Sequence, residues 1–354
     1  MKVHIFSDFD DYHAVAVHWG LKKLGVQSNI IPGISYKIDS SISFLFPEKK
    51  YKIGTKLIEP CDSAWIRRPV PPITHPDTDP LDKKFSNHEY KDAFIGLLHR
   101  LESLKLCVNS YSEEEKFENK PFQLGMAVDS KFLVPKTLMT NHPDNARKFI
   151  RSLTSECVYK AFKPHVWESK EENTHSKTRT FKITEKDLLD DFVVQSTPLI
   201  LQEYIDKAFD TRVVVMGKLI TAVKIISKNQ KDEAPTDWRP ALHINFKMDV
   251  KEIEVPENIK ESIHTFMKHS DLSFTCLDFS VDKFSNWWFL ESNANGQFLW
   301  IDYENKGMNL LSKFCSFLAS GDKGFESFKF DNSITLDKFK KSEEFNLAIK
   351  KMKG

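Results

Sequence analysis

Short apolar runs that alternate with polar turns predict a mixed α/β protein. Residues 3–7 form a strand-like run, an acidic turn follows, and the periodic stretch 15–24 ends at Gly25 as a helix would. Further elements of this kind are expected as strands at 28–31, 41–46 and 64–66, and as a helix at 87–104. Together they predict an N-terminal α/β domain over residues 1–118.

The rest of the chain predicts two α+β lobes and a short extension. Asn119 followed by Pro121 indicates a helix start, and Gly217-Lys218 between two apolar runs indicates a hairpin turn. The expected units are a central lobe with a hairpin insertion at 119–198, a C-terminal lobe at 199–320 and a helical extension at 321–354.

The composition fits a folded protein and excludes several classes. Of 354 residues, 40% are hydrophobic and 28 are Phe, which excludes a disordered or fibrous chain. Lys and Arg number 51 and Asp and Glu 50, so the net charge of +1 gives no overall field that would hold nucleic acid or an anionic membrane. The five cysteines are widely spaced without a CxxC pair, which indicates a reducing, cytoplasmic setting. No uncharged apolar run approaches the roughly 18 residues of a membrane span.

The glycine pattern excludes two common nucleotide-binding designs. Only 12 glycines occur, and neither GxGxxG nor GxxxxGK(S/T) is present. A nucleotide enzyme with this sequence must bind phosphate in another way.

The most informative segment is LDFSVDKFSNWWFLESNANGQ, residues 277–297. A hairpin turn at 283–286 would place Asp282 opposite Trp287 and, in the same register, Asp278 opposite Glu291. Opposed Cβ atoms lie about 4.5–5.5 Å apart, where like charges need compensation. Asn293 would project to the same side, so the three side chains offer the oxygen ligands that Mg²⁺ accepts. An ordinary solvated hairpin face is the alternative, but the neighbouring aromatic residues favour a site.

These residues carry a resemblance to the ATP-grasp ligases, in which a strand Asp and a following Glu-x-Asn bind Mg²⁺ and ATP. The chain is most similar to the graspetide maturases, the microviridin-type enzymes that crosslink ribosomal peptides. The similar segments, within about residues 1–318, are WIRRP (65–69), NKPFQLGMA (119–127), VPKTLMTN (134–141), VYKAF (158–162), QEYIDKAFDTRVVVMG (202–217), DWR (237–239) and ESNANGQFLWID (291–302).

The resemblance implies an ATP-grasp fold, with an N-terminal α/β domain and two α+β lobes that clamp ATP and Mg²⁺. Lys136 and Lys160 would hold the ATP phosphates as point charges, although a lone Lys is more often an ordinary surface residue. The implied adenine and ribose contacts lie at and beyond one strand end: Gln202, Glu203, Tyr204, Ile205 and Asp210. A simple strand-end charge is the alternative for Glu203.

Three basic residues, Arg212, Lys224 and Arg239, are expected to be catalytic anion binders on the acceptor side. The planar guanidinium fork suits a carboxylate or an acyl phosphate. Arg239 could instead sit in an ordinary turn, and Arg67 and Arg68 could be surface charge of the N-terminal domain, so they rank lower.

The segment after Lys160 has no glycine-rich flap that could cover phosphates. In the similar maturases a hairpin in this region captures the leader of the precursor peptide. The polar stretch 167–180 could do so by strand addition; otherwise it is a surface loop.

These features predict an ATP-dependent carboxylate ligase. Its expected substrate is a ribosomal precursor peptide, leader plus core, whose Asp or Glu side chains are phosphorylated and linked to Thr or Ser hydroxyls or to Lys amines. The resemblance further implies a homodimer. Two alternatives stay open: a ligase that acts on a small acid or a peptide C-terminus, and a regulator that binds ATP without catalysis.

Overall fold

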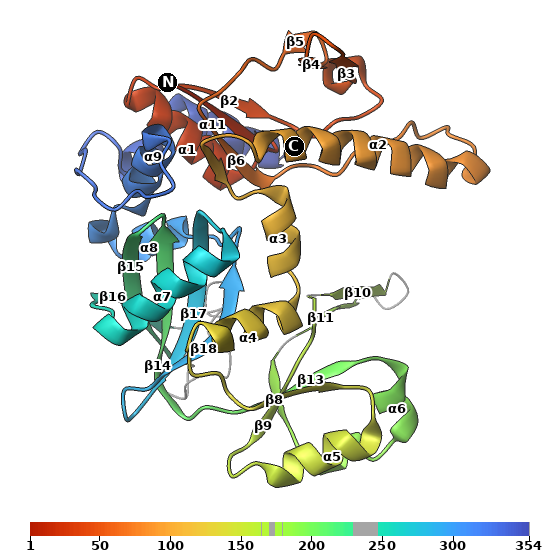
Figure 1. Cartoon of the computed structure of the whole chain (residues 1–354), viewed down its shortest axis with the longest axis vertical. Helices are drawn as coiled ribbons and strands as arrows, with labels where there is room; N and C mark the ends of the chain where they lie inside the picture. Colours follow the sequence, from red (N-terminus) through yellow and green to blue (C-terminus); the bar gives the residue numbers. More distant parts are fainter. Residues whose placement is uncertain (164, 170–173, 179, 229–246, 354) are drawn as a thin grey trace.

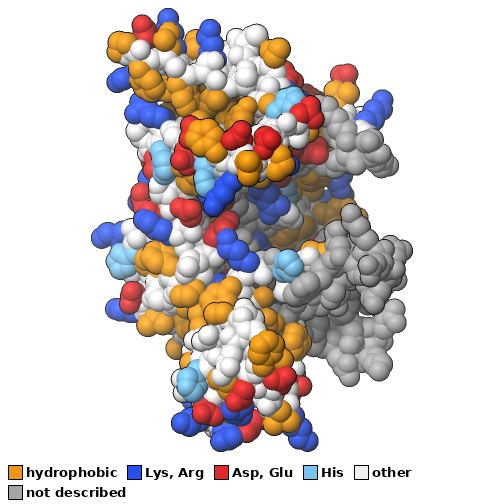
Figure 2. All heavy atoms as spheres, turned by 90° about the vertical axis from the view of Figure 1, so that its right-hand side faces the viewer, with side chains coloured by type: hydrophobic (Ala, Val, Ile, Leu, Met, Phe, Trp, Pro, Cys, Tyr) orange, Lys and Arg blue, Asp and Glu red, His pale blue; other side chains and the backbone are white. Residues whose placement is uncertain are grey.

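The computed structural model describes residues 1–163, 165–169, 174–178, 180–228 and 247–353. Three folded parts are stacked along the long axis of the molecule (Figure 1). The N-terminal domain lies at the top, the five-stranded sheet of a large lobe lies in the middle, and a smaller lobe lies at the bottom. Acidic and basic side chains are mixed over the face that Figure 2 shows, as the near-zero net charge leads one to expect.

The N-terminal domain is a parallel sheet between helices. Its strand order is β2 (Gln27–Ile31), β1 (Lys2–Ser7), β6 (Ser63–Arg68) and β7 (Leu106–Val108). One face packs on α1 (Tyr12–Lys23) and the other on α2 (Pro80–Leu101), so the strands are apolar on both faces. A small sheet of β3 (Ile42–Leu45), β4 (Lys50–Ile53) and β5 (Lys56–Leu57) follows the short 3-10 turn η1 (Ile38–Ser40).

Helix α2 begins seven residues earlier than the sequence pattern predicts, at Pro80 instead of residue 87. The Asp79 side chain accepts a hydrogen bond from the Leu81 backbone amide at 2.8 Å, and Pro80 occupies the first turn. The first half of the helix lacks a buried stripe, which is why hydrophobic periodicity alone misses it.

Two helices connect the N-terminal domain to the lobes. They are α3 (Tyr111–Phe117) and α4 (Lys120–Asp129). The predicted start of α4 is confirmed, because the Asn119 side chain accepts from the Phe122 amide at 3.2 Å and Pro121 lies in the first turn. Although the sequence assigns α4 to the central lobe, it packs with α7 (Glu257–Ser270) on the large sheet.

The small lobe is an antiparallel sheet with helices on one side. Its strand order is β12 (Phe181–Ile183), β9 (Cys157–Lys160), β13 (Leu199–Glu203) and β8 (Thr137–Thr140). Helix α5 (Pro143–Ser152), the 3-10 turn η2 (Glu185–Leu188) and α6 (Asp191–Ser196) cover it. The sequence places β13 at the start of the C-terminal lobe, but β13 pairs with β8 and β9 and so belongs to this sheet. A separate hairpin of β10 (Val166–Ser169) and β11 (Thr174–Lys177) lies within the insertion.

The large lobe is a five-stranded antiparallel sheet. Its strand order is β16 (Lys247–Ile253), β15 (Leu219–Lys228), β14 (Lys207–Met216), β17 (Phe274–Asp282) and β18 (Trp287–Asn293). The predicted hairpin turn is confirmed at Gly217, whose φ of +61° suits glycine. Apolar side chains of β14 alternate between the face under α4 and α7 and the face toward α8 (Leu299–Glu304) and α9 (Leu310–Ser320).

The C-terminal segment packs back onto the N-terminal domain. After the 3-10 turn η4 (Lys306–Met308), α9, α10 (Leu336–Phe339) and α11 (Glu343–Lys353) all contact α1. Gly20 of α1 allows this approach, because a Cβ there would lie 2.5 Å from the Cys315 sulfur. No described helix is long and apolar enough to cross a membrane.

Asn109 joins the N-terminal domain to the large sheet. Its Nδ2 donates to the carbonyls of Phe274 and Ala294 at 2.8 Å each, and its Oδ1 accepts from the amides of Ser273 and Phe274 at 2.9 and 3.0 Å. Because the side chain is 1% exposed, water cannot replace these bonds.

We therefore expect Asn109→Ala to lower the free energy of unfolding by about 3 kcal/mol or more, since each buried group left unpaired costs about 1–3 kcal/mol. Urea denaturation measures the change. Asn332→Ala, at an exposed position, is the control and should be neutral. Equal stability of the two variants would contradict the role given to Asn109.

Candidate active site

Two carboxylates face each other across the last two strands of the large sheet. Asp278 of β17 pairs directly with Glu291 of β18, as the sequence predicts. The predicted pairing of Asp282 with Trp287 is wrong, because Val281 pairs with Trp287. A bulge at Leu290 shifts the register by one residue and restores the Asp278–Glu291 pair.

Each of the two carboxylates has a cation beside it. Arg212 of β14 donates from one Nη to the Asp278 carboxylate at 3.1 and 3.3 Å, and both side chains are buried. Lys120, at the start of α4, lies 3.5 Å from a Glu291 oxygen. These cations offset the repulsion that two opposed carboxylates would otherwise have.

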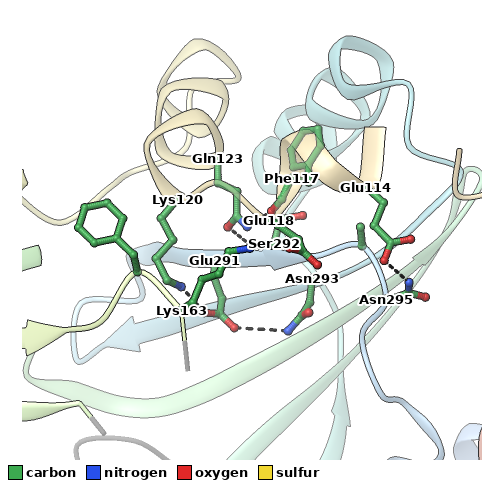
Figure 3. Close-up of a pocket in the computed structure, with 12 residues that line it drawn as sticks. Glu114, Phe117, Glu118, Lys120, Gln123, Lys163, Glu291, Ser292, Asn293 and Asn295 are labelled. Atoms are coloured by element: carbon green, nitrogen blue, oxygen red, sulfur yellow. Dashed lines mark hydrogen bonds and ion pairs between the residues drawn. The ribbon is translucent and has the colours of Figure 1, made fainter. Parts of the chain in front are cut away.

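The partly exposed side of this pair opens into a pocket of about 350 Å³. Figure 3 shows Glu291 and Asn293 projecting from the same side of β18. The Asn293 side-chain nitrogen Nδ2 lies 3.5 Å from Oε1 of Glu291. Helices α3 and α4 form the opposite wall, and Phe162 and Lys163 come from the small lobe. The pocket therefore lies where both lobes meet the connecting helices.

The oxygen donors at this place suit a hard cation that keeps water ligands. Among the described residues, no three His, Cys, Asp or Glu side chains converge on one point. A cation beside Asp278 and Glu291 would complete its coordination with the Asn293 oxygen, water and phosphate oxygens, as Mg²⁺ commonly does.

The two lysines expected to bind phosphate differ in their surroundings. The Lys160 ammonium donates to the Gln202 side-chain oxygen at 2.6 Å, and the Gln202 amide donates to the Thr137 hydroxyl at 2.8 Å. This chain of bonds fixes Lys160 on the inner strands of the small lobe. Lys136 is exposed at the edge of that lobe, where its backbone carbonyl accepts from the Glu203 amide at 2.8 Å.

The strand end expected to meet adenine has several of its polar groups in use. Besides the Glu203 amide, the Tyr204 amide donates to the Glu156 carbonyl at 2.8 Å. The Glu203 carboxylate accepts from the Lys136 amide and the Ser155 hydroxyl, both at 3.4 Å. An adenine edge would thus have to form its hydrogen bonds with Ile205 or with backbone carbonyl groups of this stretch. The adenine contacts expected here stay a prediction.

The structure does not bring together the other predicted residues. Asp210 is buried, with the Lys207 ammonium at 2.5 Å and the Ser280 hydroxyl at 2.9 Å. Lys224 pairs with Thr211, the neighbour of Arg212, so it projects from the opposite face of the sheet. Its ammonium lies 4.2 Å from the centre of the Phe209 ring, so the structure does not place Lys224 beside Arg212, and its predicted role stays a prediction. Arg239 lies outside the described residues.

The N-terminal domain contributes a charge that the sequence analysis ranked too low. Arg67, considered there as surface charge, is 1% exposed and donates to the Asn295 carbonyl at 2.5 Å. Its Nε lies 3.5 Å from an Asp11 oxygen. The pKa of the neighbouring His13 lies well below its usual value, because the ring is buried and then because Arg67, Arg68 and Arg212 repel a proton there.

Two wall residues of the pocket were also missed. Lys120 lies within the segment NKPFQLGMA that carries the resemblance, but it was interpreted only as part of a helix start. Glu114 is the middle one of three consecutive glutamates on a short helix and looks like an exposed acid in the sequence. Only the packing of α3 against the turn after β18 makes its place visible.

Comparison with known proteins establishes the fold. No protein-family model matches the chain, and no curated protein matches it significantly. A Chryseobacterium gregarium RiPP-associated ATP-grasp ligase, solved with ADP and a leader and core peptide, is similar with a TM-score of 0.80 and 20% identity, over 92% of this chain and 99% of that one.

Two further structures are similar over the same region. The macrocyclase MdnC of Microcystis aeruginosa MRC, bound with precursor peptide MdnA, has a TM-score of 0.73 and 19% identity, over 90% of this chain and 100% of that one. The ATP-grasp ligase PsnB, solved with a precursor variant, Mg and ADP, has a TM-score of 0.70 and 20% identity, over 90% of this chain and 98% of that one. The predicted ATP-grasp fold, with its N-terminal domain and two lobes, is confirmed.

The burial of the Arg212–Asp278 pair leads to a stability prediction. We expect Asp278→Asn to lower the free energy of unfolding by about 3–5 kcal/mol, because it leaves a buried guanidinium without its carboxylate. Denaturant unfolding measures the loss. Glu291→Gln is the matched control. The side chains of Glu291 and Lys120 are 19% and 24% exposed, so this variant should lose less than about 1 kcal/mol of unfolding free energy. Equal losses in both variants would contradict this assignment.

Proposed function

We propose that this chain is an ATP-dependent carboxylate ligase that closes rings in a ribosomal precursor peptide, as the graspetide maturases do. The observation that carries the proposal is the Asp278–Glu291 pair with Asn293 beside it, at the meeting point of two ATP-grasp lobes. Solved structures with this fold hold ADP, Mg and precursor peptides, which supports the same ligands here.

In this proposal Asp278, Glu291 and Asn293 hold Mg²⁺, and Lys136 and Lys160 contact the phosphates of ATP. When bound, the Mg²⁺ ion neutralises phosphate charge and so lowers the cost of phosphoryl transfer. The adenosine part would lie against the end of β13, near Gln202, Glu203, Tyr204 and Ile205, with Asp210 toward the ribose.

The substrate carboxylate needs activation because a carboxylate is a poor electrophile. Transfer of the terminal phosphoryl group of ATP onto one of its oxygens gives an acyl phosphate and ADP. A hydroxyl or amine of the same peptide then attacks the acyl carbon, the carbon–oxygen bond to phosphate breaks, and an ester or amide remains. Arg212 and Arg239 are proposed to stabilise negative charge at this step through hydrogen bonds. The reaction then needs no covalent intermediate on the enzyme.

The β10–β11 hairpin offers the peptide an edge on which to dock. Each of the two strands has one partner among the described residues, so an extended peptide could pair with the other edge. We include leader capture by this hairpin, a homodimeric assembly and a cytoplasmic location in the proposal.

The test is the intact mass of a precursor peptide encoded beside the gene, after incubation with the protein, ATP and Mg²⁺. The proposal predicts the loss of one water per crosslink. Glu291→Gln should lower the rate of crosslinking at least about 100-fold, because it removes the negative charge of a proposed metal ligand while the fold is kept.

Two other results would contradict ring closure in this peptide. Ligation of free amino acids or small acids without a leader would identify a small-acid ligase. Tight ATP binding, with no ATP consumed in the presence of any peptide tested, would identify a regulator.

A further inference from the structure

Glu114 is a carboxylate of the pocket wall that the proposed chemistry has not yet used. It lines the same pocket as Glu291 and Asn293 (Figure 3). One of its oxygens, Oε1, accepts from the Asn295 side-chain amide. The other, Oε2, is buried and has no hydrogen-bond partner among the described residues. A buried carboxylate oxygen without a donor is costly, so a group that supplies a proton there would be bound favourably.

The position of this carboxylate is fixed from both sides. On one side, the N-cap residue of α3 is Ser110, which comes directly after the Asn109 anchor, and its carbonyl accepts from the Glu114 amide at 3.0 Å. On the other side, Asn295 is held through its carbonyl by buried Arg67. A carboxylate fixed in this way needs little reorganisation to meet a reacting group.

The charges around Glu114 favour proton exchange near neutral pH. Burial raises its pKa to about 7, with a smaller contribution from Glu118, while the Asn295 hydrogen bond, Arg67 and Arg68 oppose the shift. Lys120 and Lys163 face the same pocket from the start of α4 and from the small lobe. A group of this kind can accept a proton and release it again near neutral pH.

We propose that Glu114 is the catalytic base of ring closure. It accepts the proton of the attacking hydroxyl or amine while that oxygen or nitrogen bonds to the acyl carbon. Phosphate leaves with the electron pair of the broken carbon–oxygen bond, and Glu114 later returns the proton to water. This inference rests on the proposed function, since it concerns the second step of the same reaction.

The experiment separates the two steps with Glu114→Gln. Acyl phosphate formation is followed by trapping with hydroxylamine, which attacks acyl phosphates without help from a base, and ring closure is followed by intact mass of the precursor peptide. We expect Glu114→Gln to form hydroxamate within about twofold of the wild-type rate and to close rings at least about 100-fold more slowly. Glu115→Gln, at an exposed position one residue further on α3, is the control and should keep both rates.

The pH dependence gives a second readout that a purely structural carboxylate would not change. Deprotonation activates a base, so wild-type ring closure should rise with pH through an apparent pKa near 7, and this limb should be absent in Glu114→Gln. Glu114→Asp should restore part of the rate and the limb.

Three outcomes decide the question. Wild-type ring closure by Glu114→Gln would overturn the base assignment and leave the ligase proposal standing. Loss of hydroxamate and rings together in a variant that unfolds at the wild-type temperature would also overturn it, because Glu114 would then act before the second step. Absence of ATP-dependent hydroxamate in the wild type, with every peptide carboxylate offered, would overturn the ligase proposal itself.

Discussion

The site depends on the repulsion between two carboxylates that face each other across neighbouring strands. Asp278 and Glu291 would destabilise the sheet if nothing offset their charge. Arg212 offsets the first from the centre of the sheet, and Lys120 offsets the second from a helix over the sheet edge. This arrangement keeps two negative groups together without a buried excess charge, and it leaves the less buried carboxylate beside the pocket where a cation could bind.

The N-terminal domain takes part in the same construction. The Asn109 side chain bonds to the start of β17 and to Ala294 after β18, and Arg67 bonds to Asn295 in the same turn. The turn after β18 is thus fixed by residues that lie far away in the sequence. This explains how Glu114, on the helix directly after Asn109, comes to face a pocket that the large sheet forms.

Much of the fold could be predicted from the sequence, because local signals report it directly. The Asn119 cap, the Gly217 turn and the alternation in β17 and β18 depend on near neighbours along the chain. The bulge at Leu290 was not predicted, because counting back from the turn pairs one residue with one residue throughout, and the bulge leaves one residue of β18 unpaired. The places of Arg67 and Lys224 could not be predicted for one reason: a charged residue in the sequence does not show which face of a sheet it takes or what covers it.

The central claim is that ATP activates a peptide carboxylate as an acyl phosphate before the ring closes. The most direct measurement uses a precursor peptide whose side-chain carboxylates carry ¹⁸O, and follows the label after reaction with ATP and Mg²⁺. The account predicts that one labelled oxygen per crosslink appears in inorganic phosphate. Crosslinked peptide with no label in the phosphate would contradict it.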